Sequence, residues 1–344
     1  MKPLLLPVLE KPVDLTDQCL RHGRKEGSQP GKNKNAWVTA RTRAKTFIGA
    51  STQLLIDKLD GAQKKIPTLE ELPAFEKEMW NASVNVPETL RTLGQLKAAQ
   101  KIAKRLRIGA YRMIGKIPAN RFDELKKSER MFAGRFSSLV RSLGDSIEAY
   151  NRTRRIVSQF PSIDASIPTL LLAGVPNAGK STIMKRLTGA NVEIASYPFT
   201  TKSLNVAYFD YRYLRLQVID TPGLLDRPAV QRNNVEKKAF SALRHVAGIL
   251  LFVVDPTQAG SESLENQRQL LDEIKSTLSP PRVHVVLNKT DAAALAEQSR
   301  ARELFKIDFE SNPSDPCAWK DALARELVEQ EKKRVLRPRP NAGV

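Results

Sequence analysis

The sequence predicts an α/β domain with a mostly parallel sheet and helices on both faces, preceded by an all-α helical bundle. The length of 344 residues exceeds that of most single domains. Between Glu88 and Phe160 apolar residues recur at three- and four-residue spacing, which is typical of helices that bury one face. After residue 166, short β-rich runs alternate with longer helical segments, as in parallel sheets with crossover helices.

The beginning of the chain is rich in basic side chains. Residues 18–56 contain eight Lys or Arg and a single acidic residue, Glu26. We therefore expect residues 1–50 to form a basic arm that contacts RNA. An organelle transit peptide is the alternative interpretation of the same stretch.

Residues 51–160 are expected to form an antiparallel helical bundle. One helix is predicted from Glu88 to the break at Pro118, and a longer helical segment follows it. The apolar positions that define the buried face of this second segment are Phe122, Leu125, Phe132, Phe136, Leu139, Leu143, Ile147 and Tyr150.

The first of these helices carries a strongly basic face. The basic residues assigned to this face are Lys97, Lys101, Lys104, Arg105, Arg107 and Arg112. No acidic residue lies between Lys97 and Arg121, and residues 1–165 carry a net charge of +14, against +5 for residues 166–344. Such a surplus favours a polyanionic partner, so we predict that this face binds RNA. An ordinary solvated helix face is the alternative.

Cysteine content and hydropathy exclude two classes of protein. Only Cys19 and Cys317 are present, without C-x-x-C spacing, which argues against a disulfide framework or a cysteine zinc site and favours a reducing compartment. The longest apolar run, AGILLFVV, ends at Asp255 and is too short to cross a bilayer. We therefore expect a soluble intracellular protein without a membrane partner.

The α/β domain is expected to span residues 166–331 and to be followed by a basic tail over residues 332–344. Its predicted strands are TLLLAG, YLRLQVID, AGILLFVVD, VHVVLN and LFKIDF. Segments such as SLENQRQLLDEIKSTL lie between them and are long enough to form crossover helices.

The segment GVPNAGKS, residues 174–181, matches the phosphate-binding loop G-x-x-x-x-G-K-[ST] between a strand and a helix. Gly174 and Gly179 would let successive amides face the phosphates, and Lys180 would reach the β and γ phosphates. The Ser181 hydroxyl would ligate Mg²⁺. The nucleotide-binding residues expected here are Asn177, Ala178, Gly179, Lys180, Ser181 and Thr182.

Two later segments complete a guanine-nucleotide site. In VIDTPG, Asp220 closes an apolar strand and would hold Mg²⁺ through a water, while the Gly223 amide would bond the γ-phosphate. In NKTD, Asp291 would accept two hydrogen bonds from guanine, whereas adenine offers no donors there. Asn288 would support the loop, and the Lys289 stem would cover the base. The predicted ligands are therefore GTP or GDP with Mg²⁺.

Between the first two motifs, SYPFTTKS is the expected nucleotide-sensing switch. A Thr hydroxyl there would join the Mg²⁺ shell only while the γ-phosphate is present, and we favour Thr201 over Thr200. The residues assigned to catalysis are Lys180, Thr201, Asp220 and Gly223, and those assigned to the metal are Ser181, Thr201 and Asp220. In ESNPSD, Ser311 is a weaker candidate for the loop behind the guanine.

The combination of GVPNAGKS, YPFTTKSL, DTPGLLDRP, RNNVEK and NKTD resembles the Obg-related GTPases, and within them the nucleolar GTP-binding protein (NOG) family. The resemblance covers residues 160–292 and extends more weakly into the helices through LGQLKAAQKIAKRL and FPSID. It implies a monomeric GTPase factor in maturation of the large ribosomal subunit, with ribosomal RNA and pre-ribosomal particle proteins as partners. The alternatives are a signalling GTPase with a protein effector and a GTP-binding placeholder with little hydrolysis.

The resemblance also bears on rate and location. Leu224 follows DTPG where Ras-like enzymes present the glutamine that orients water, which implies slow intrinsic hydrolysis. Asn177 matches the loop asparagine that helps several relatives hold K⁺, although it could simply shape the loop. Eukaryotic nucleolar members carry a long extension after the G domain, whereas this sequence stops soon after KDALARELVEQEKKR, so contacts of that extension are not expected from the resemblance. The basic start favours a mitochondrial location, with the nucleolus as the alternative.

Overall fold

The computed structural model of the chain describes residues 6–29, 35–160, 163–164, 166–189, 192–196, 203–222, 225–226, 237, 240–246, 248–257, 262–311 and 318–336. The described residues divide into two compact units. The bundle unit comprises the residues up to Thr68 together with Val84–Ser158, and the α/β unit comprises Leu69–Ser83 and the residues from Gln159 onward. The predicted fold class, a helical bundle with a mostly parallel α/β domain, is confirmed.

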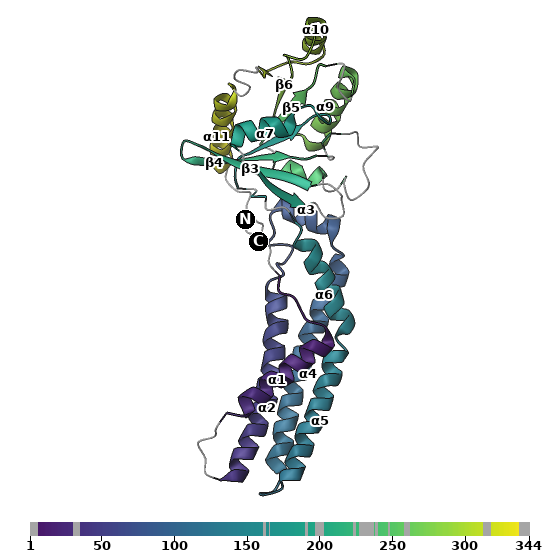
Figure 1. Cartoon of the computed structure of the whole chain (residues 1–344), viewed down its shortest axis with the longest axis vertical. Helices are drawn as coiled ribbons and strands as arrows, with labels where there is room; N and C mark the ends of the chain where they lie inside the picture. The colour runs from purple at the N-terminus through teal and green to yellow at the C-terminus, as the bar shows by residue number, and fades with distance from the viewer. Residues whose placement is uncertain are drawn as a thin grey trace. The chain divides into compact units, whose positions relative to one another are not determined.

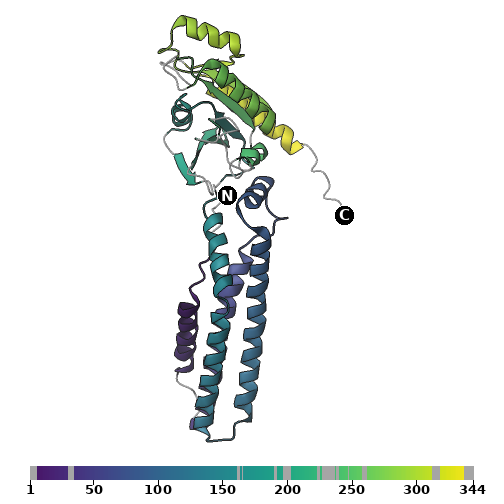
Figure 2. The same ribbon diagram turned by 90° about the vertical axis from the view of Figure 1, so that its right-hand side faces the viewer.

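The described part of the bundle unit contains α1 (Pro12–Gly27), α2 (Ala36–Lys64), α4 (Val86–Lys116), α5 (Phe122–Arg141) and α6 (Gly144–Val157). Figures 1 and 2 show α2, α4 and α5 running alongside one another, and α1 packs on α2 and α5. The apolar faces of these helices meet in one core, in which Leu55, Leu96 and Phe136 are completely buried. Burial of such faces is what stabilises the long helices.

The ends of the long helices follow from local sequence. Asn35 caps α2 because its side chain accepts hydrogen bonds from the backbone amides of Trp37 and Val38, at 2.9 and 3.2 Å. Asn85 caps α4 in the same way by accepting from Glu88 at 3.2 Å. The predicted break at Pro118 lies just after α4, which ends at Lys116.

The helical segment predicted after Pro118 is divided into α5 and α6. α5 ends at Arg141, and α6 begins at Gly144 after a single turn. The apolar positions predicted for the buried face are buried, except Phe122, whose side chain is 39% exposed. The Phe122 ring packs edge-on against Trp37, with ring centroids 5.3 Å apart.

The described residues among the first fifty belong to the bundle and do not form a separate arm, which corrects the expectation for residues 1–50. Leu15 and Cys19 in α1 are fully buried, and Trp37 in α2 is 6% exposed. Burial raises the pKa of the Cys19 thiol to about 12. Exposed basic residues dominate the composition of this stretch, and they mask the narrow apolar stripe that packs α1 into the core.

The α/β unit is built on a sheet with the strand order β2-β3-β4-β1-β5-β6-β7. The strands are β1 (Thr169–Ala173), β2 (Val192–Ser196), β3 (Ser203–Tyr211), β4 (Leu214–Asp220), β5 (Ile249–Val254), β6 (Arg282–Leu287) and β7 (Phe309–Glu310). β1 pairs in parallel with β4 and β5, and β5, β6 and β7 continue the parallel order. β2 and β3 are antiparallel additions at one edge.

Two strand expectations need adjustment. The pair β2 and β3 was not expected from the sequence, and β3 joins β4 through a tight turn in which Arg212 adopts a φ of 57°. Of the predicted run LFKIDF, only Phe309 at its end is part of a strand, the two-residue β7. The completely buried strands β1 and β5 were easier to predict because apolar residues fill every position of β5 and every position of β1 except Thr169.

Several helices of the α/β unit follow the strands. Those within the described residues are α7 (Lys180–Thr188), α9 (Leu264–Leu278), α10 (Leu295–Leu304), α11 (Lys320–Leu336) and the short 3₁₀ helix η2 (Leu243–His245). α7 packs on β1, β3 and β4, whereas α9 packs on β5 and α10. Helix α7 follows the central strand β1 in the chain. The turn between such a strand and helix is the usual place for a phosphate site.

One helix of the α/β unit comes from the N-terminal half of the chain. α3 (Ala74–Ser83) lies between α2 and α4 in sequence, yet Phe75 and Met79 are buried in the α/β core. Glu78 pairs with Arg244 and His245 around η2, at 3.2 and 2.8 Å. The α/β unit is therefore assembled from two separate stretches of the chain.

None of the described helices is both long enough and apolar enough to cross a membrane.

Candidate guanine-nucleotide site

The phosphate loop occupies the turn between β1 and α7, and its glycines are required by backbone geometry. Gly174 has a φ of +138°, and a Cβ there would lie 2.4 Å from the Val253 carbonyl oxygen. Gly179 has a φ of +100°, and a Cβ there would lie 2.1 Å from Asn288 Nδ2. Asn177 also adopts a positive φ, of 61°. The loop therefore follows a path that L side chains at its two glycines would block.

Lys180 is held inside this loop. Its side chain is 6% exposed, and Nζ donates hydrogen bonds to the carbonyl oxygens of Gly174 and Val175, at 2.7 and 2.8 Å. Burial lowers the pKa of Lys180, while the nearby carboxylates of Asp220 and Asp226 act in the opposite direction. The ammonium group is thus positioned at the loop, where phosphate oxygens would replace the carbonyls as acceptors.

Two of the three residues expected to hold Mg²⁺, Ser181 and Asp220, come together where α7 begins and β4 ends. Ser181 Oγ donates to Asp220 Oδ2 at 2.8 Å, and Asn205 Nδ2 donates to the same oxygen at 3.3 Å. Asp220 is fully buried, and its Oδ1 atom is a buried acceptor without a hydrogen-bond partner in the described structure. A buried carboxylate oxygen beside a hydroxyl suits Mg²⁺, which prefers hard oxygen ligands and keeps several waters. The residues therefore fit the ion.

Asn288 joins the guanine loop to the phosphate loop. Its side-chain Nδ2 donates to the Ala178 carbonyl oxygen at 2.8 Å, and its backbone amide donates to Val254 at 3.0 Å. The side chain is 9% exposed. Because one bond crosses 110 positions of sequence, the two loops share one framework.

Lys289 is positioned by a residue that sequence reasoning missed. Its Nζ pairs with Asp255 Oδ2 at 2.7 Å, and Asp255 is only 1% exposed. The backbone amide of Asp255 donates to the Gln267 side chain at 3.0 Å, and its Oδ1 accepts from Thr257. The signal in the sequence was an acid directly after the apolar run of β5. A Lys289 side chain anchored in this way would present its stem to a bound base, as the sequence predicts.

Asp291 is the last residue of the guanine loop, and Ser311 contacts the loop from a later segment. Asp291 is exposed and has no ion pair or hydrogen bond with the described residues, so both carboxylate oxygens can accept from a base. The Ser311 amide donates to Leu287 at 2.9 Å, and its carbonyl accepts from Thr290 Oγ1 at 3.1 Å. Ser311 therefore lies next to the guanine loop, where a residue behind the guanine would have to be.

The structure brings the nucleotide-binding candidates of the two loops and Asp220 to one end of the parallel strands. These residues are Asn177, Ala178, Gly179, Lys180, Ser181, Thr182, Asp220, Asn288, Lys289 and Asp291. The switch candidates Thr200 and Thr201, together with Gly223 and Leu224, lie outside the described residues. Their roles stay predictions.

The basic residues assigned to RNA lie in the bundle unit, on α4. Lys97, Lys101, Lys104, Arg105 and Arg112 are exposed, and Arg107 is half-buried and donates to Gln53 at 3.2 Å. None of them forms an ion pair with the residues that the structure describes. Exposed cations that lack counter-ions within the bundle are available to phosphate groups.

Comparison with known proteins identifies two matching family models. Residues 5–164 match the NOG1 N-terminal helical domain, and residues 169–289 match the 50S ribosome-binding GTPase family. The first match includes α1 and α2, which agrees with their place in the bundle core.

Relatives match across both regions. An uncharacterized protein of Methanocaldococcus jannaschii is 33% identical, with 86% of this chain and 82% of that protein covered. Nucleolar GTP-binding protein 1 of Kluyveromyces lactis is 31% identical over 83% of this chain and 44% of its own length. The Saccharomyces cerevisiae protein of the same name is 32% identical over 69% of this chain and 36% of its own length. This chain thus spans less than half of the length of these two nucleolar relatives.

Proposed function

The chain belongs to the nucleolar GTP-binding protein family of P-loop GTPases, and from this we propose that it assists maturation of the large ribosomal subunit. It would bind ribosomal RNA and proteins of the pre-ribosomal particle, and GTP hydrolysis would control its release. The observation that carries this proposal is the basic face of α4, which has no counter-ions among the described residues.

The α4 face favours RNA over a protein effector. Lys97, Lys101 and Lys104 lie at three- and four-residue spacing, so they share one side of the helix. A row of exposed cations matches the spacing of phosphates only loosely, and therefore gives affinity without strong sequence preference. A protein effector would call for an apolar patch, because the centres of protein–protein interfaces are depleted in charged residues.

Catalysis would follow from the residues around the phosphate loop. A water oxygen attacks the γ-phosphorus and the bond to the β–γ bridging oxygen breaks, giving GDP and phosphate. Lys180 would neutralise charge on the β and γ phosphates, and Ser181 and Asp220 would hold Mg²⁺. The metal would supply charge for the developing negative oxygens. Asp291 would select guanine.

We also propose a slow intrinsic rate. Leu224 stands where a glutamine would orient water, so another trigger is needed. Asn177, whose positive φ turns the loop, could help K⁺ neutralise charge near the phosphates.

The proposed location is the site of large-subunit assembly. The names of the relatives are consistent with the nucleolus and do not support the earlier preference for a mitochondrion. 

The RNA part is tested by charge reversal on α4. Changing Lys97, Lys101, Lys104 and Arg105 to Glu should weaken binding to large-subunit RNA by at least about tenfold and reduce the salt dependence of binding. GDP affinity should be unchanged. The matched control reverses four exposed basic residues of α5, namely Lys126, Lys127, Arg135 and Arg141. Equal loss in both variants would indicate general charge attraction and contradict the assignment to α4.

Turnover is tested by measuring phosphate release in K⁺ and in Na⁺, with and without precursor particles of the large subunit. Acceleration by particles or K⁺, and its loss in Lys180→Ala, would support a gated GTPase. GTP binding without turnover under every condition would favour a placeholder that binds GTP structurally.

A further inference from the structure

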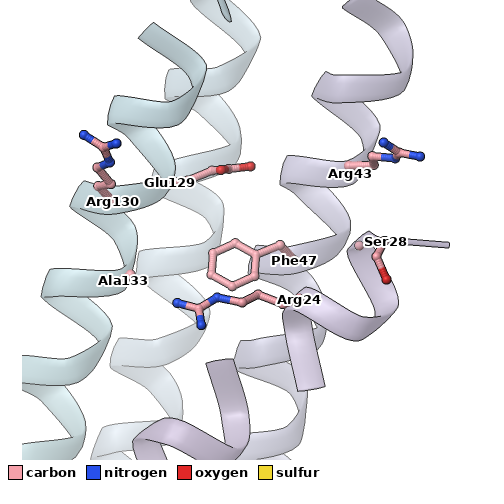
Figure 3. Close-up of a pocket in the computed structure, with 8 residues that line it drawn as sticks. Arg24, Ser28, Arg43, Phe47, Glu129, Arg130 and Ala133 are labelled. Carbon is pink, nitrogen blue, oxygen red and sulfur yellow. The ribbon is translucent and has the colours of Figure 1, made fainter. Parts of the chain in front are cut away.

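A pocket of ≈ 340 Å³ lies in the bundle unit between α1, α2 and α5 (Figure 3). Its walls are formed by Arg24, Gly27, Ser28, Arg43, Phe47, Glu129, Arg130 and Ala133. None of these residues belongs to α4, so the pocket is separate from the basic face described above. Its chemistry combines three arginines, one carboxylate and an aromatic ring.

The charged groups of the pocket do not neutralise one another. Arg24, Arg43 and Arg130 are exposed, and none forms an ion pair with the described residues. Glu129 is half-buried and also lacks an ion pair or side-chain hydrogen bond there. In Figure 3 the side chains of Arg24 and Glu129 extend from facing helices toward the space between them. Guanidinium groups left unpaired at a concave site are suited to phosphate.

The floor of the pocket is apolar and closely packed. Phe47 is 9% exposed, and its ring is packed edge-on by Phe132, with centroids 5.9 Å apart. Gly27 allows α1 to approach α2, because a Cβ there would lie 3.0 Å from the Arg43 carbonyl oxygen and 3.5 Å from Phe47 Cβ. An aromatic floor held rigidly in this way is suited to a flat ring.

Glu129 adds a directional group to this floor. Burial raises the pKa of its carboxyl, and the charge of Lys126 acts in the opposite direction. A half-buried carboxylate gains most from a ligand that donates hydrogen bonds to it. Among nucleobases, guanine offers N1–H and N2–H side by side and can donate to both carboxylate oxygens.

We propose that this pocket binds a single unpaired nucleotide of the RNA, with its phosphate on Arg24, whose side chain extends toward Phe47 in Figure 3, its base against Phe47 and a guanine edge on Glu129. Recognition of unpaired bases by stacking and edge hydrogen bonds is the usual way in which proteins read RNA sequence. This inference rests on the proposed function. It adds a preference for base identity and for unpaired positions, which the α4 face cannot provide.

The test uses the full chain saturated with GDP and Mg²⁺, so that the GTPase site cannot bind the probe. RNA hairpins with one stem and a single-nucleotide bulge of G, A, C or U are compared with the uninterrupted stem by fluorescence anisotropy. The G-bulge hairpin should bind about tenfold more tightly than the uninterrupted stem, because stacking and edge contacts add to phosphate binding. The affinities of the hairpins with A, C or U bulges should lie between those of the G-bulge hairpin and the uninterrupted stem.

Variants separate the groups of the pocket. Glu129→Gln should remove the preference for G over the other bulges and leave binding to the stem unchanged. Arg24→Gln should weaken all bulged hairpins several-fold more than the stem. The matched controls on α5, Glu124→Gln and Arg141→Gln, lie outside the pocket and should change neither.

Three results would overturn the proposal in distinguishable ways. Equal binding of bulged and uninterrupted hairpins, or a G preference that survives Glu129→Gln, would refute the pocket while leaving RNA binding by α4 intact. Binding of free 5′-GMP without a preference for bulged RNA would reassign the pocket to a free nucleotide. Binding of no hairpin at all would refute the proposed RNA function and this inference together.

Discussion

The side chain of Asn288 links the two nucleotide loops directly. Its amide donates to Ala178, and it fills the space that Gly179 leaves free of a side chain. The same residue therefore fixes the position of the phosphate loop relative to the guanine loop. The contact also explains why position 179 tolerates only glycine.

Replacement of Asn288 by Ala should weaken GDP binding. The variant leaves the buried Ala178 carbonyl without its donor, which costs about 1–3 kcal/mol, or roughly tenfold or more in affinity if the loss falls on the bound state. Titration with a fluorescent GDP analogue measures this change. Asn266→Ala, which removes an exposed amide of α9, serves as the control. Unchanged affinity in Asn288→Ala would show that the loops are held independently.

The buried Cys19 thiol makes a pH-dependent contribution to stability. Its pKa is raised from 9.0 to about 12 by burial, so the folded chain keeps a proton that the unfolded chain loses above pH 9. The contribution is complete below pH 9 and is lost as pH rises through 9 toward 12. Wild type should therefore lose about 1 kcal/mol more than Cys19→Val between pH 8 and pH 10. Urea unfolding at each pH gives the difference, and parallel pH profiles would contradict it.

Among the helices, the contact between α1 and α2 is set by close approach of their backbones. A Cβ at Gly23 would lie 2.0 Å from Ser51 Oγ and 2.6 Å from the Phe47 carbonyl oxygen. Backbone atoms cannot yield as the end of a flexible side chain can. This approach is what places α1 in the bundle core, although its composition suggests a solvated arm.

Gly23→Ala should therefore destabilise the bundle by about 1–3 kcal/mol through overpacking. Gly134→Ala is a matched control within α5, where a Cβ would meet nothing within 4 Å. That control should be neutral or stabilise by up to about 1 kcal/mol, because Ala is the better helix former. Chemical unfolding followed by circular dichroism measures both. Equal effects of the two substitutions would disprove the packing argument.

The predictability of each element depended on whether its signal was local. Strand β5 and the loop GVPNAGKS were predictable because apolar runs, glycines and a lysine carry their structure within a few residues. Strand β3, which lies between the edge strand β2 and β4, was missed because polar residues such as Asn205 and Asp210 interrupt its apolar pattern. The bond from Asn288 to Ala178 and the partner of Lys289 depend on distant residues that no local pattern reveals.

On the scale of the whole molecule, order in sequence and order in space differ. The α/β unit takes α3 from the N-terminal half, and the bundle segment Val84–Ser158 separates α3 from β1 in the chain. Phe75 and Met79 fill part of the α/β core, and Trp80 packs edge-on against Phe160. The two units therefore cannot be separated by a single cut of the chain.

A fragment that starts at Gln159 should be less stable than the same unit in the full chain. It lacks the apolar side chains of α3, and loss of two large core residues typically costs several kcal/mol, about 2–5 for each. A peptide of residues 69–83 added in trans should raise the melting temperature of the fragment. The same peptide with Phe75→Ser and Met79→Ser is the control. A fragment as stable as the unit in the full chain would contradict this role of α3.

The split origin of the α/β unit also has a consequence for synthesis on the ribosome. Strand β6, the last long strand of the sheet, ends at Leu287, about 200 positions after α3. At about 5–20 residues per second, α3 has to wait on the order of 10–40 s before that strand exists. During this interval its apolar side chains have no core to enter, so the nascent chain offers a binding site for a chaperone until the sheet is complete.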